Sequence, residues 1–293
     1  MARSNEKLVK DKRGLSLLKN KSFITRTITS VIIFAFTVLA FVLGYTIMLC
    51  ILGILSLVGL WEFYRAQDLL WKPFAICGFI ADIVYFVLIR FYGNEYSALY
   101  LVFLLAMFVI AEMLIFILNY PKYSLHDVYI SFFGVFYVGV TLSFLYITRV
   151  HDWGAYLVWL AIWSSWGSDV FAYLGGMLFG KHRAFPDISP KKTYEGCLSG
   201  IIGAGILGFI WALIVQNIVP VTENEVLIFP IICMIGSVIG MVGDLFASSI
   251  KRSVGIKDYS NLFPGHGGVL DRFDSVIAVS PIIYVVTLLI RIW

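Results

Sequence analysis

The chain has 293 residues, of which 60% are hydrophobic and 14% are charged, and its formal net charge is +4. Soluble domains contain roughly 45–50% apolar and about 25% charged residues, so this composition excludes a soluble globular protein. Apolar runs recur from residue 28 to the C-terminus, and a helix needs about 20 apolar residues to cross a bilayer. The runs lack the alternation of barrel strands, which predicts an all-α polytopic membrane protein.

We expect about nine transmembrane helices. Their predicted ranges are 28–43, 45–60, 73–89, 97–118, 128–147, 155–179, 198–215, 226–247 and 275–292. The first two ranges are short and meet at Gly44, so one long tilted helix is an alternative to two. Basic residues in short loops stay in the cytoplasm. A cytoplasmic N-terminus with nine spans places all 22 basic residues inside except Arg90, Arg149 and Arg291, which predicts a multi-pass protein of the cell membrane.

Polarity divides the chain into three parts. Residues 1–27 form a basic cytoplasmic tail, residues 28–150 the N-terminal transmembrane helices, and residues 151–293 a catalytic transmembrane region with cytoplasmic loops. Because the basic residues are explained by topology, we expect no nucleic-acid partner. The four cysteines have no metal-site or disulfide spacing and are expected to be free thiols.

Four charged residues of the first half receive structural interpretations. Glu62, Arg65 and Asp68 follow a predicted span and are expected at the membrane interface. Glu112 falls inside the span 97–118, where a charge costs at least about 2.5–3.5 kcal/mol. We therefore expect Glu112 to face protein, to be protonated, or to lie nearer the interface.

Asp169 opens the first polar cluster of the second half. It lies in an apolar stretch and shares a helix face with Tyr173 and Gly176, at spacings i+4 and i+7. Carboxylates inside a membrane are candidates for a functional role, and a buried hydrogen bond is the alternative. Asp169 is therefore an additional candidate site residue.

The same cluster continues to a Ser-Pro pair that is typical of a helix start. Ser189 reads as the N-cap and Pro190 as the first helical residue. The cations that follow would oppose the helix dipole unless an anion binds there. This pattern predicts a phosphate contact formed by Ser189, Lys191, Lys192 and Thr193.

The densest polar signal lies near the C-terminus. Asp244, Ser248 and Lys251 are spaced i, i+4 and i+7, so they share one helix face. Further on, Asp271 and Asp274 are three residues apart at the start of the last span. Two carboxylates held this close repel each other, which raises the pKa of one of them or recruits a cation. Mg²⁺ commonly takes one or two carboxylates together with substrate phosphates.

Glycines precede these two aspartates. Gly265, Gly267 and Gly268 would let backbone amides approach phosphate oxygens near a helix N-terminus. For either aspartate alone, capping of the helix is an equal alternative. Capping does not explain the whole set of charges, so we favour a phosphate and metal site.

These residues resemble a known family. Residues 248–274 follow the pattern S-x-hydrophobic-K-R, four residues, K-D, and then P-x-H-G-G-hydrophobic-x-D-R-hydrophobic-D. This pattern closely resembles that of the phosphatidate cytidylyltransferases, or CDP-diacylglycerol synthases, in a form of bacterial length. Residues 169–196 resemble the same family through D-x-x-A-Y, F-G-K and S-P-K-K-T-x-E-G. The resemblance covers most of residues 165–275, and the first half matches in hydrophobicity only.

The resemblance implies an activity and a set of site residues. The family converts CTP and phosphatidic acid, a membrane lipid, into CDP-diacylglycerol and pyrophosphate. It depends on Mg²⁺, often with K⁺, and works as a homodimer. By resemblance, Asp244, Asp271 and Asp274 are the metal ligands and, with Lys251, the catalytic set. Candidates for phosphate binding are Ser248, Arg252, Lys257, His266, Gly267, Gly268 and Arg272.

Two other classes of function stay open on the sequence. A CTP-dependent polyprenol or phytol kinase would also need phosphate and metal chemistry at a membrane surface. An ion or lipid transporter would explain Asp169 and Glu112 but would leave the glycine and aspartate pattern unexplained.

Overall fold

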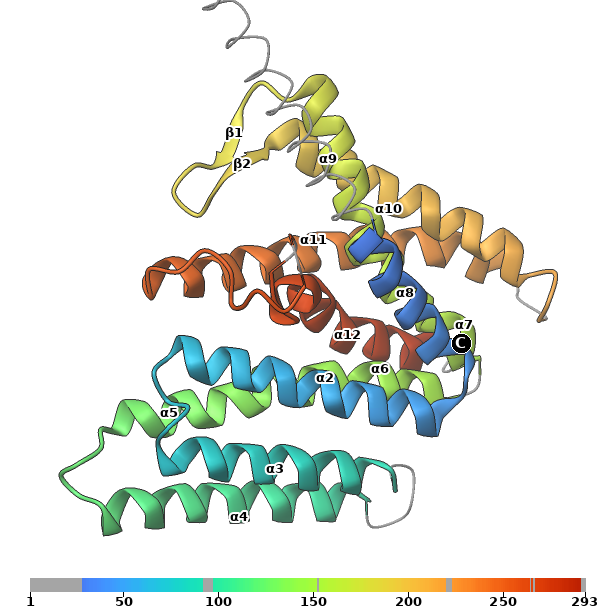
Figure 1. The fold of residues 1–293 in the computed structure, drawn as a ribbon. Coiled ribbons are helices and arrows are strands. Elements are labelled where there is room, and N and C mark those ends of the chain that lie inside the picture. Colours follow the sequence, from blue (N-terminus) through green and yellow to red (C-terminus); the bar gives the residue numbers. More distant parts are fainter. Residues whose placement is uncertain are drawn as a thin grey trace, which may run out of the picture.

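The computed structural model describes residues 28–91, 97–151, 153–219, 223–263, 265 and 267–290. These residues form helices and one two-stranded hairpin (Figure 1). Among the described residues, five helices are long and apolar enough to cross a bilayer, namely Tyr45–Ala66, Leu99–Leu118, Leu125–Val150, Tyr194–Val215 and Val226–Ser253. Ile28–Val42 and Pro73–Ile89 are shorter apolar helices. The prediction of an all-α polytopic membrane protein is confirmed, while the basic tail 1–27 lies outside the described residues.

The first half of the described chain forms a succession of helices. After Ile28–Val42 come α2 (Tyr45–Ala66), α3 (Pro73–Ile89), α4 (Ser97–Leu118), α5 (Leu125–Gly134), the π-helix η1 (Val135–Val140) and α6 (Thr141–Val150). Gly44 separates the first two helices, and its φ of 103° is one that side-chain-bearing residues rarely adopt. The alternative of one long helix over residues 28–60 is therefore wrong.

The second half is less regular. It contains α7 (Gly154–Leu157), α8 (Trp159–Ile162), the π-helix η2 (Trp163–Gly167) and α9 (Ser168–Phe179), followed by β1 (Arg183–Phe185), β2 (Ser189–Thr193), α10 (Tyr194–Val215), α11 (Glu223–Ser253) and α12 (Leu270–Ile290). The span predicted over 155–179 is thus divided into short segments. The π-helix η2 ends one residue before α9, and π-helical turns often occur near functional sites.

The hairpin contradicts the predicted helix start at Ser189. Ser189 pairs with Phe185, and Thr193 pairs with Arg183, so residues 189–193 are extended. The helix begins later, at Tyr194, where the Thr193 side chain accepts a hydrogen bond of 3.1 Å from the amide of Gly196. The pairing of β2 with β1 therefore determines the structure of this segment, although its Ser-Pro pair is typical of a helix start. Thr193 is the N-cap residue of α10.

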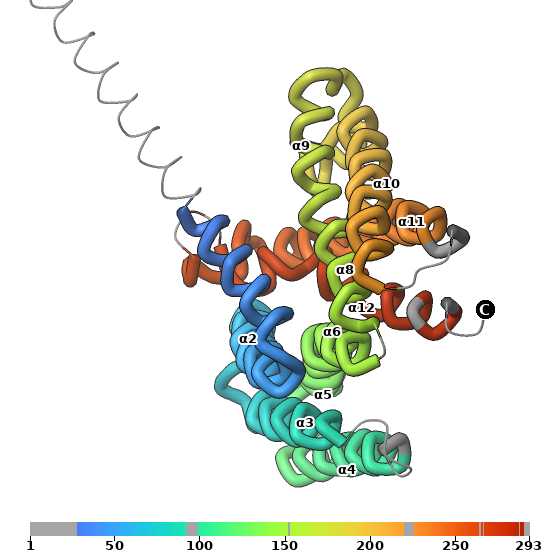
Figure 2. Tube along the Cα trace, turned by 90° about the vertical axis from the view of Figure 1, so that its right-hand side faces the viewer, coloured from blue at the N-terminus to red at the C-terminus, as the bar shows by residue number. Residues whose placement is uncertain are grey.

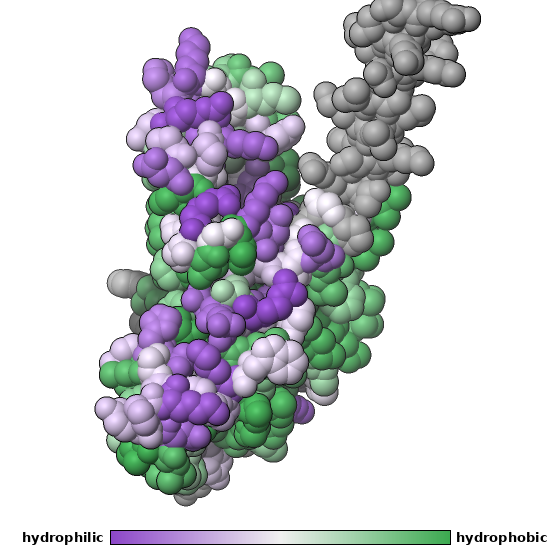
Figure 3. Space-filling view, turned by 60° about the vertical axis from the view of Figure 1, so that its left-hand side comes forward, coloured by the Kyte–Doolittle hydropathy of each residue, from purple (hydrophilic) through white to green (hydrophobic). Residues whose placement is uncertain are grey.

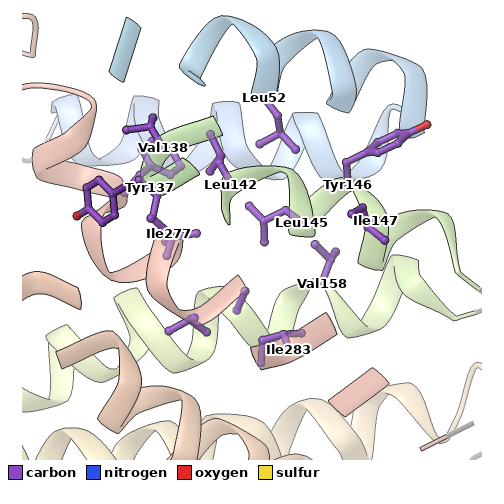
Figure 4. Close-up of a cluster of buried hydrophobic side chains, with 14 of the residues drawn as sticks. Leu52, Tyr137, Val138, Leu142, Leu145, Tyr146, Ile147, Val158, Ile277 and Ile283 are labelled. Atoms are coloured by element: carbon purple, nitrogen blue, oxygen red, sulfur yellow. The ribbon is translucent and has the colours of Figure 1, made fainter. Parts of the chain in front are cut away.

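Helices α10, α11 and α12 pack in sequence order, and α12 also packs against α6. Figure 2 shows α3 and α4 at one end of the molecule and α9 with α10 at the other, with α2, α6 and α12 between them. Buried apolar side chains from α2, η1, α6 and α12 meet at the centre (Figure 4), among them Leu52, Val138, Leu145 and Ile277. This core joins the N-terminal helices to the helix that carries Asp271 and Asp274.

Small residues bring α9 close to α10. A Cβ atom at Gly200 would lie 2.9 Å from Ser168 Oγ and 3.1 Å from Ala172 Cβ. A Cβ at Gly196 would lie 2.8 Å from the carbonyl oxygen of Ala172. Helices in membranes approach closely where such small residues face one another. This approach fixes the hairpin, which enters α10, relative to Asp169 on α9.

We expect Gly200→Val to destabilise the protein by about 1–3 kcal/mol, because the added methyl groups overpack the contact with α9. Ile202→Val, on the exposed side of the same helix, should change stability by less than about 0.5 kcal/mol. Thermal unfolding of the purified variants in detergent measures both. Equal transition temperatures for Gly200→Val and the unmutated protein would contradict this account of the packing.

Candidate active site

Helix α11 presents the predicted polar face. Asp244, Ser248 and Lys251 all lie within α11, which confirms their helical spacing. Lys251 Nζ donates a hydrogen bond of 2.7 Å to Asp271 Oδ1, and both residues are buried. This ion pair joins the end of α11 to the start of α12.

The carboxylate of Asp271 also organises the loop between these helices. Its Oδ2 accepts hydrogen bonds from the amide of Tyr259 at 2.8 Å and from the amide of Gly268 at 2.9 Å. Burial raises the pKa of Tyr259, and the negative charge of Asp271 raises it further, so the phenol stays neutral. Because the donors precede Asp271 in the chain, Asp271 does not act as an ordinary N-cap. Asp274 lies inside α12, so capping does not explain it either.

Three carboxylates approach one another beside this ion pair. Asp274 is buried, and both Asp244 and Asp169 lie near enough to act on it electrostatically. Lys192 Nζ lies 2.5 Å from Asp244 Oδ2. The hairpin cluster and the C-terminal cluster, which are some 50 residues apart in the sequence, therefore form one site.

Two cavities open at this site, and Asp169 lines both. One has a volume of about 370 Å³ and lies between α9 and the hairpin, with Lys191, Lys192 and Thr193 in its wall. The other has a volume of about 300 Å³ and is lined by Asp169, Asp271, Arg272 and Asp274 together with Ser30, Ile33, Phe34, Trp166 and Val170. The wall of the second cavity therefore combines charged groups with apolar side chains of the helix Ile28–Val42.

The other predicted site residues line neither cavity and differ in burial. Ser248 is buried on α11 and Ser189 is half-buried at the start of β2, whereas Arg252 and Lys257 are exposed. Arg252 Nη1 donates to the carbonyl oxygen of Ile256 at 3.1 Å. His266 lies outside the described residues, so its role stays a prediction.

The glycine amides are engaged within the loop itself. The Gly267 amide donates to the Phe263 carbonyl oxygen at 3.1 Å, while the Gly268 amide donates to Asp271. Gly267 has a φ of 85°, which explains why glycine occupies this turn. Phosphate binding by these amides stays a prediction.

Sequence reasoning missed one acidic residue of this region. Glu62 was expected at the interface, but its side chain is fully buried. It accepts hydrogen bonds from Ser260, Val269 and Leu270. Glu62 and its partners are about 200 residues apart in the chain, so no local pattern indicated this contact. Asp68 is exposed, and the exposed Arg65 also reaches the loop through the Tyr259 carbonyl oxygen, at 3.1 Å; a position of these two residues at the membrane interface stays a prediction.

Glu112 and the cysteines follow their predictions. Glu112 is buried on α4 and accepts a hydrogen bond of 2.7 Å from Ser131 Oγ, so it faces protein. The four cysteines are free.

The carboxylates of the site can be compared with the ligands that the expected Mg²⁺ ion prefers. Within the ranges that the structure describes, no three His, Cys, Asp or Glu side chains are arranged to hold a metal ion by themselves. Carboxylate oxygens are nevertheless the hard ligands that Mg²⁺ prefers, and this ion commonly takes one or two of them beside substrate phosphates. Asp244 and Asp274 carry donors that suit such an ion, whose remaining ligands would come from the substrate; the ion itself stays a prediction.

The similarity to known proteins extends over nearly the whole chain. The profile of the cytidylyltransferase family matches residues 24–290. The chain belongs to this family. The match includes the first half, where the sequence had indicated similarity in hydrophobicity only, so the cytidylyltransferase region also contains α2 and Glu62.

Individual relatives of this cytidylyltransferase agree with the family match. A phosphatidate cytidylyltransferase of Staphylococcus haemolyticus is 30% identical over 88% of this chain and 96% of its own length. One of Staphylococcus epidermidis is 31% identical over the same shares of both chains. A third, from Rickettsia felis, is 34% identical over 53% of this chain and 69% of its own length.

We expect Lys251→Met to destabilise the protein by about 3–5 kcal/mol, because it leaves the Asp271 carboxylate buried without its counter-charge. Lys257→Met, at an exposed position of the following loop, should change stability by less than about 0.5 kcal/mol. Equilibrium unfolding in detergent micelles measures the difference. A loss below about 1 kcal/mol for Lys251→Met would show that water solvates Asp271 in the folded protein.

Proposed function

We propose that this protein is a phosphatidate cytidylyltransferase, which converts CTP and phosphatidic acid into CDP-diacylglycerol and pyrophosphate. The observation that carries the proposal is the ion pair of Lys192 with Asp244. It joins the hairpin lysines to the aspartates of α11 and α12, so that cations and carboxylates surround one pair of cavities. Such a site suits two phosphate-bearing substrates that must meet.

The reaction is a nucleotidyl transfer. An oxygen of the lipid phosphate attacks the α-phosphorus of CTP, a new P–O bond forms, and the bond to the β-phosphate oxygen breaks to release pyrophosphate. The attacking phosphate is already ionised at neutral pH, so no general base is needed. Positioning and charge stabilisation supply the rate acceleration.

The chain's own cations perform much of this task. Lys192, Lys251 and Arg272 hold positive charge beside the carboxylates and can shift toward phosphate oxygens when substrates bind. Asp244 and Asp274 would hold a magnesium ion, with Asp271 and Asp169 next to them. When bound, this ion would supply neutralisation of the phosphate oxygens and of the leaving group. Potassium would assist as a further cation.

The two cavities support a division between the substrates. The cavity lined by Lys191, Lys192 and Thr193 is the more basic one and suits the triphosphate of CTP. The other is lined by Arg272 together with the apolar side chains of Ile33 and Phe34, which suits a phosphate that carries acyl chains. Asp169 lines both cavities, where the reacting phosphates would meet.

We further propose nine membrane crossings, a cytoplasmic N-terminus, a location in the cell membrane and a homodimer. The hairpin and the loop between α11 and α12 lie at the same side of the molecule (Figure 1). Hydrophilic residues gather in a band on this face, with hydrophobic residues beside it (Figure 3). A cytoplasmic position of this face agrees with the distribution of basic residues, and CTP would reach the site from there.

Labelled CTP tests the reaction. We expect the purified protein, given phosphatidic acid and Mg²⁺, to transfer label from the α-phosphate of CTP into lipid and to release label from the γ-phosphate as pyrophosphate. Thin-layer chromatography of the products measures both. Lipid labelled only from the γ-phosphate would identify a kinase and would contradict the proposal, as would substrate flux into liposomes without any use of nucleotide.

Asp274→Asn tests the acidic site. We expect turnover to fall by at least ~100-fold, because a neutral amide binds the proposed Mg²⁺ ion more weakly than a carboxylate does. The charge on the transferred phosphate would then be less well stabilised. The matched control is Asp187→Asn, at an exposed aspartate in the hairpin turn, which should keep normal turnover. Gel filtration and thermal unfolding check that both variants are folded. Near-normal activity of Asp274→Asn would show that this carboxylate has no part in catalysis.

A further inference from the structure

The carboxylate of Glu62 contacts the start of α12 from another helix. Oε1 accepts hydrogen bonds from Ser260 Oγ at 2.5 Å and from the amide of Val269 at 3.0 Å. Oε2 accepts from the amide of Leu270 at 2.8 Å. Glu62 lies near the end of α2 and is 0% exposed. One buried side chain thus accepts from three donors, in the loop between α11 and α12 and at the start of α12.

Two of these donors belong to the N-terminus of α12. The first amides of a helix have no acceptor within it, and a negative charge beside them is favourable because of the helix dipole. In this structure the acceptor for Val269 and Leu270 comes from α2. Glu62 therefore caps α12 from a distance and determines where this helix begins.

Gly268 fits closely against the same carboxylate. A Cβ atom at Gly268 would overlap both carboxylate oxygens of Glu62. No positive φ requires glycine at this position, so the space taken by Glu62 is the structural reason for its lack of a side chain. Arg65, nearly one turn further along α2, adds a hydrogen bond of 3.1 Å to the carbonyl oxygen of Tyr259. Helix α2 thus holds the loop at Tyr259 and Ser260 and again where the loop enters α12.

We propose that Glu62 is a positioning residue for the transfer reaction. It holds the first turn of α12, and thereby Asp271 and Asp274, at the place where they face Asp244 and Lys251. The effect of Glu62 on kinetics rests on the proposed function. The contact between Glu62 and the loop is independent of that function and can be measured separately.

Kinetics provide the first test, in the full-length protein in lipid nanodiscs. Glu62→Ala removes both acceptor oxygens and with them all three hydrogen bonds. We expect kcat to fall by about 10–100-fold, as for other residues that orient active-site ligands. The KM for CTP should change by less than about 3-fold, because Glu62 lines neither cavity. Glu62→Gln keeps Oε1 as an acceptor but places an amide donor opposite the Leu270 amide, so its kcat should lie between those of Glu62→Ala and the unmutated protein.

Glu112→Gln is the matched control. Glu112 is also buried in the first half, but it accepts its hydrogen bond from Ser131 on α5, far from the loop in sequence. We expect this variant to keep kcat within about 2-fold, because a glutamine still accepts from Ser131. A kcat loss shared equally by the Glu62 and Glu112 variants would mean that any buried carboxylate of the first half supports the fold, and it would overturn the positioning role.

Hydrogen exchange gives a readout without turnover. In Glu62→Ala, peptides covering residues 259–272 should lose protection while peptides from α4 and α10 keep theirs. This result would support the contact even if the protein catalysed a different reaction. Unchanged protection of residues 259–272, or a parallel loss of protection throughout the chain, would overturn the proposal.

A double-mutant cycle tests the fit with Gly268. Gly268→Ala should lower kcat strongly in the presence of Glu62, since the new Cβ displaces the carboxylate. The shorter side chain of Glu62→Asp should relieve part of this loss, so that the double variant is more active than the two single effects predict. Strictly additive effects would show that Gly268 and Glu62 act independently, and would also count against the proposal.

Discussion

The site depends on a requirement of the polypeptide backbone: amides buried in the loop before α12 must find acceptors. Two carboxylates supply them. Glu62 takes the amides of Val269 and Leu270, and Asp271 takes those of Tyr259 and Gly268. The loop is therefore held between a helix of the first half and the helix that it precedes. This arrangement fixes the direction of the first turn of α12, on which the acidic site is built.

The site also requires cations that balance the negative charges of its carboxylates. Carboxylates gathered at one end of a membrane protein repel one another unless cations lie between them. Lys251 from α11 and Lys192 from the hairpin each approach an aspartate within 2.7 Å. The cations come from different segments, so the fold must form before the charges can balance. In the proposed reaction, the phosphates of both substrates would share these cations with the carboxylates.

The glycine contacts between α9 and α10 connect this electrostatic arrangement to the membrane fold. Apolar side chains cover much of the exterior, and lipid provides little hydrophobic drive for helices to associate with one another. Close packing through Gly196 and Gly200 supplies an alternative. It places Asp169, on α9, beside the hairpin that leads into α10. Asp169 lines both cavities, the basic one and the one bordered by the first helix.

The sequence by itself determined the class of fold, the family and most of the charged residues of the site, because long apolar runs and the spacing of Asp244, Lys251, Asp271 and Asp274 are local properties of the chain. It misplaced the helix start at Ser189, since pairing with Phe185 on a neighbouring strand decided that segment. Only the tertiary structure joined the two polar clusters and brought Glu62 to the start of α12. Both results come from hydrogen bonds and ion pairs between distant residues, whose energies no local pattern encodes.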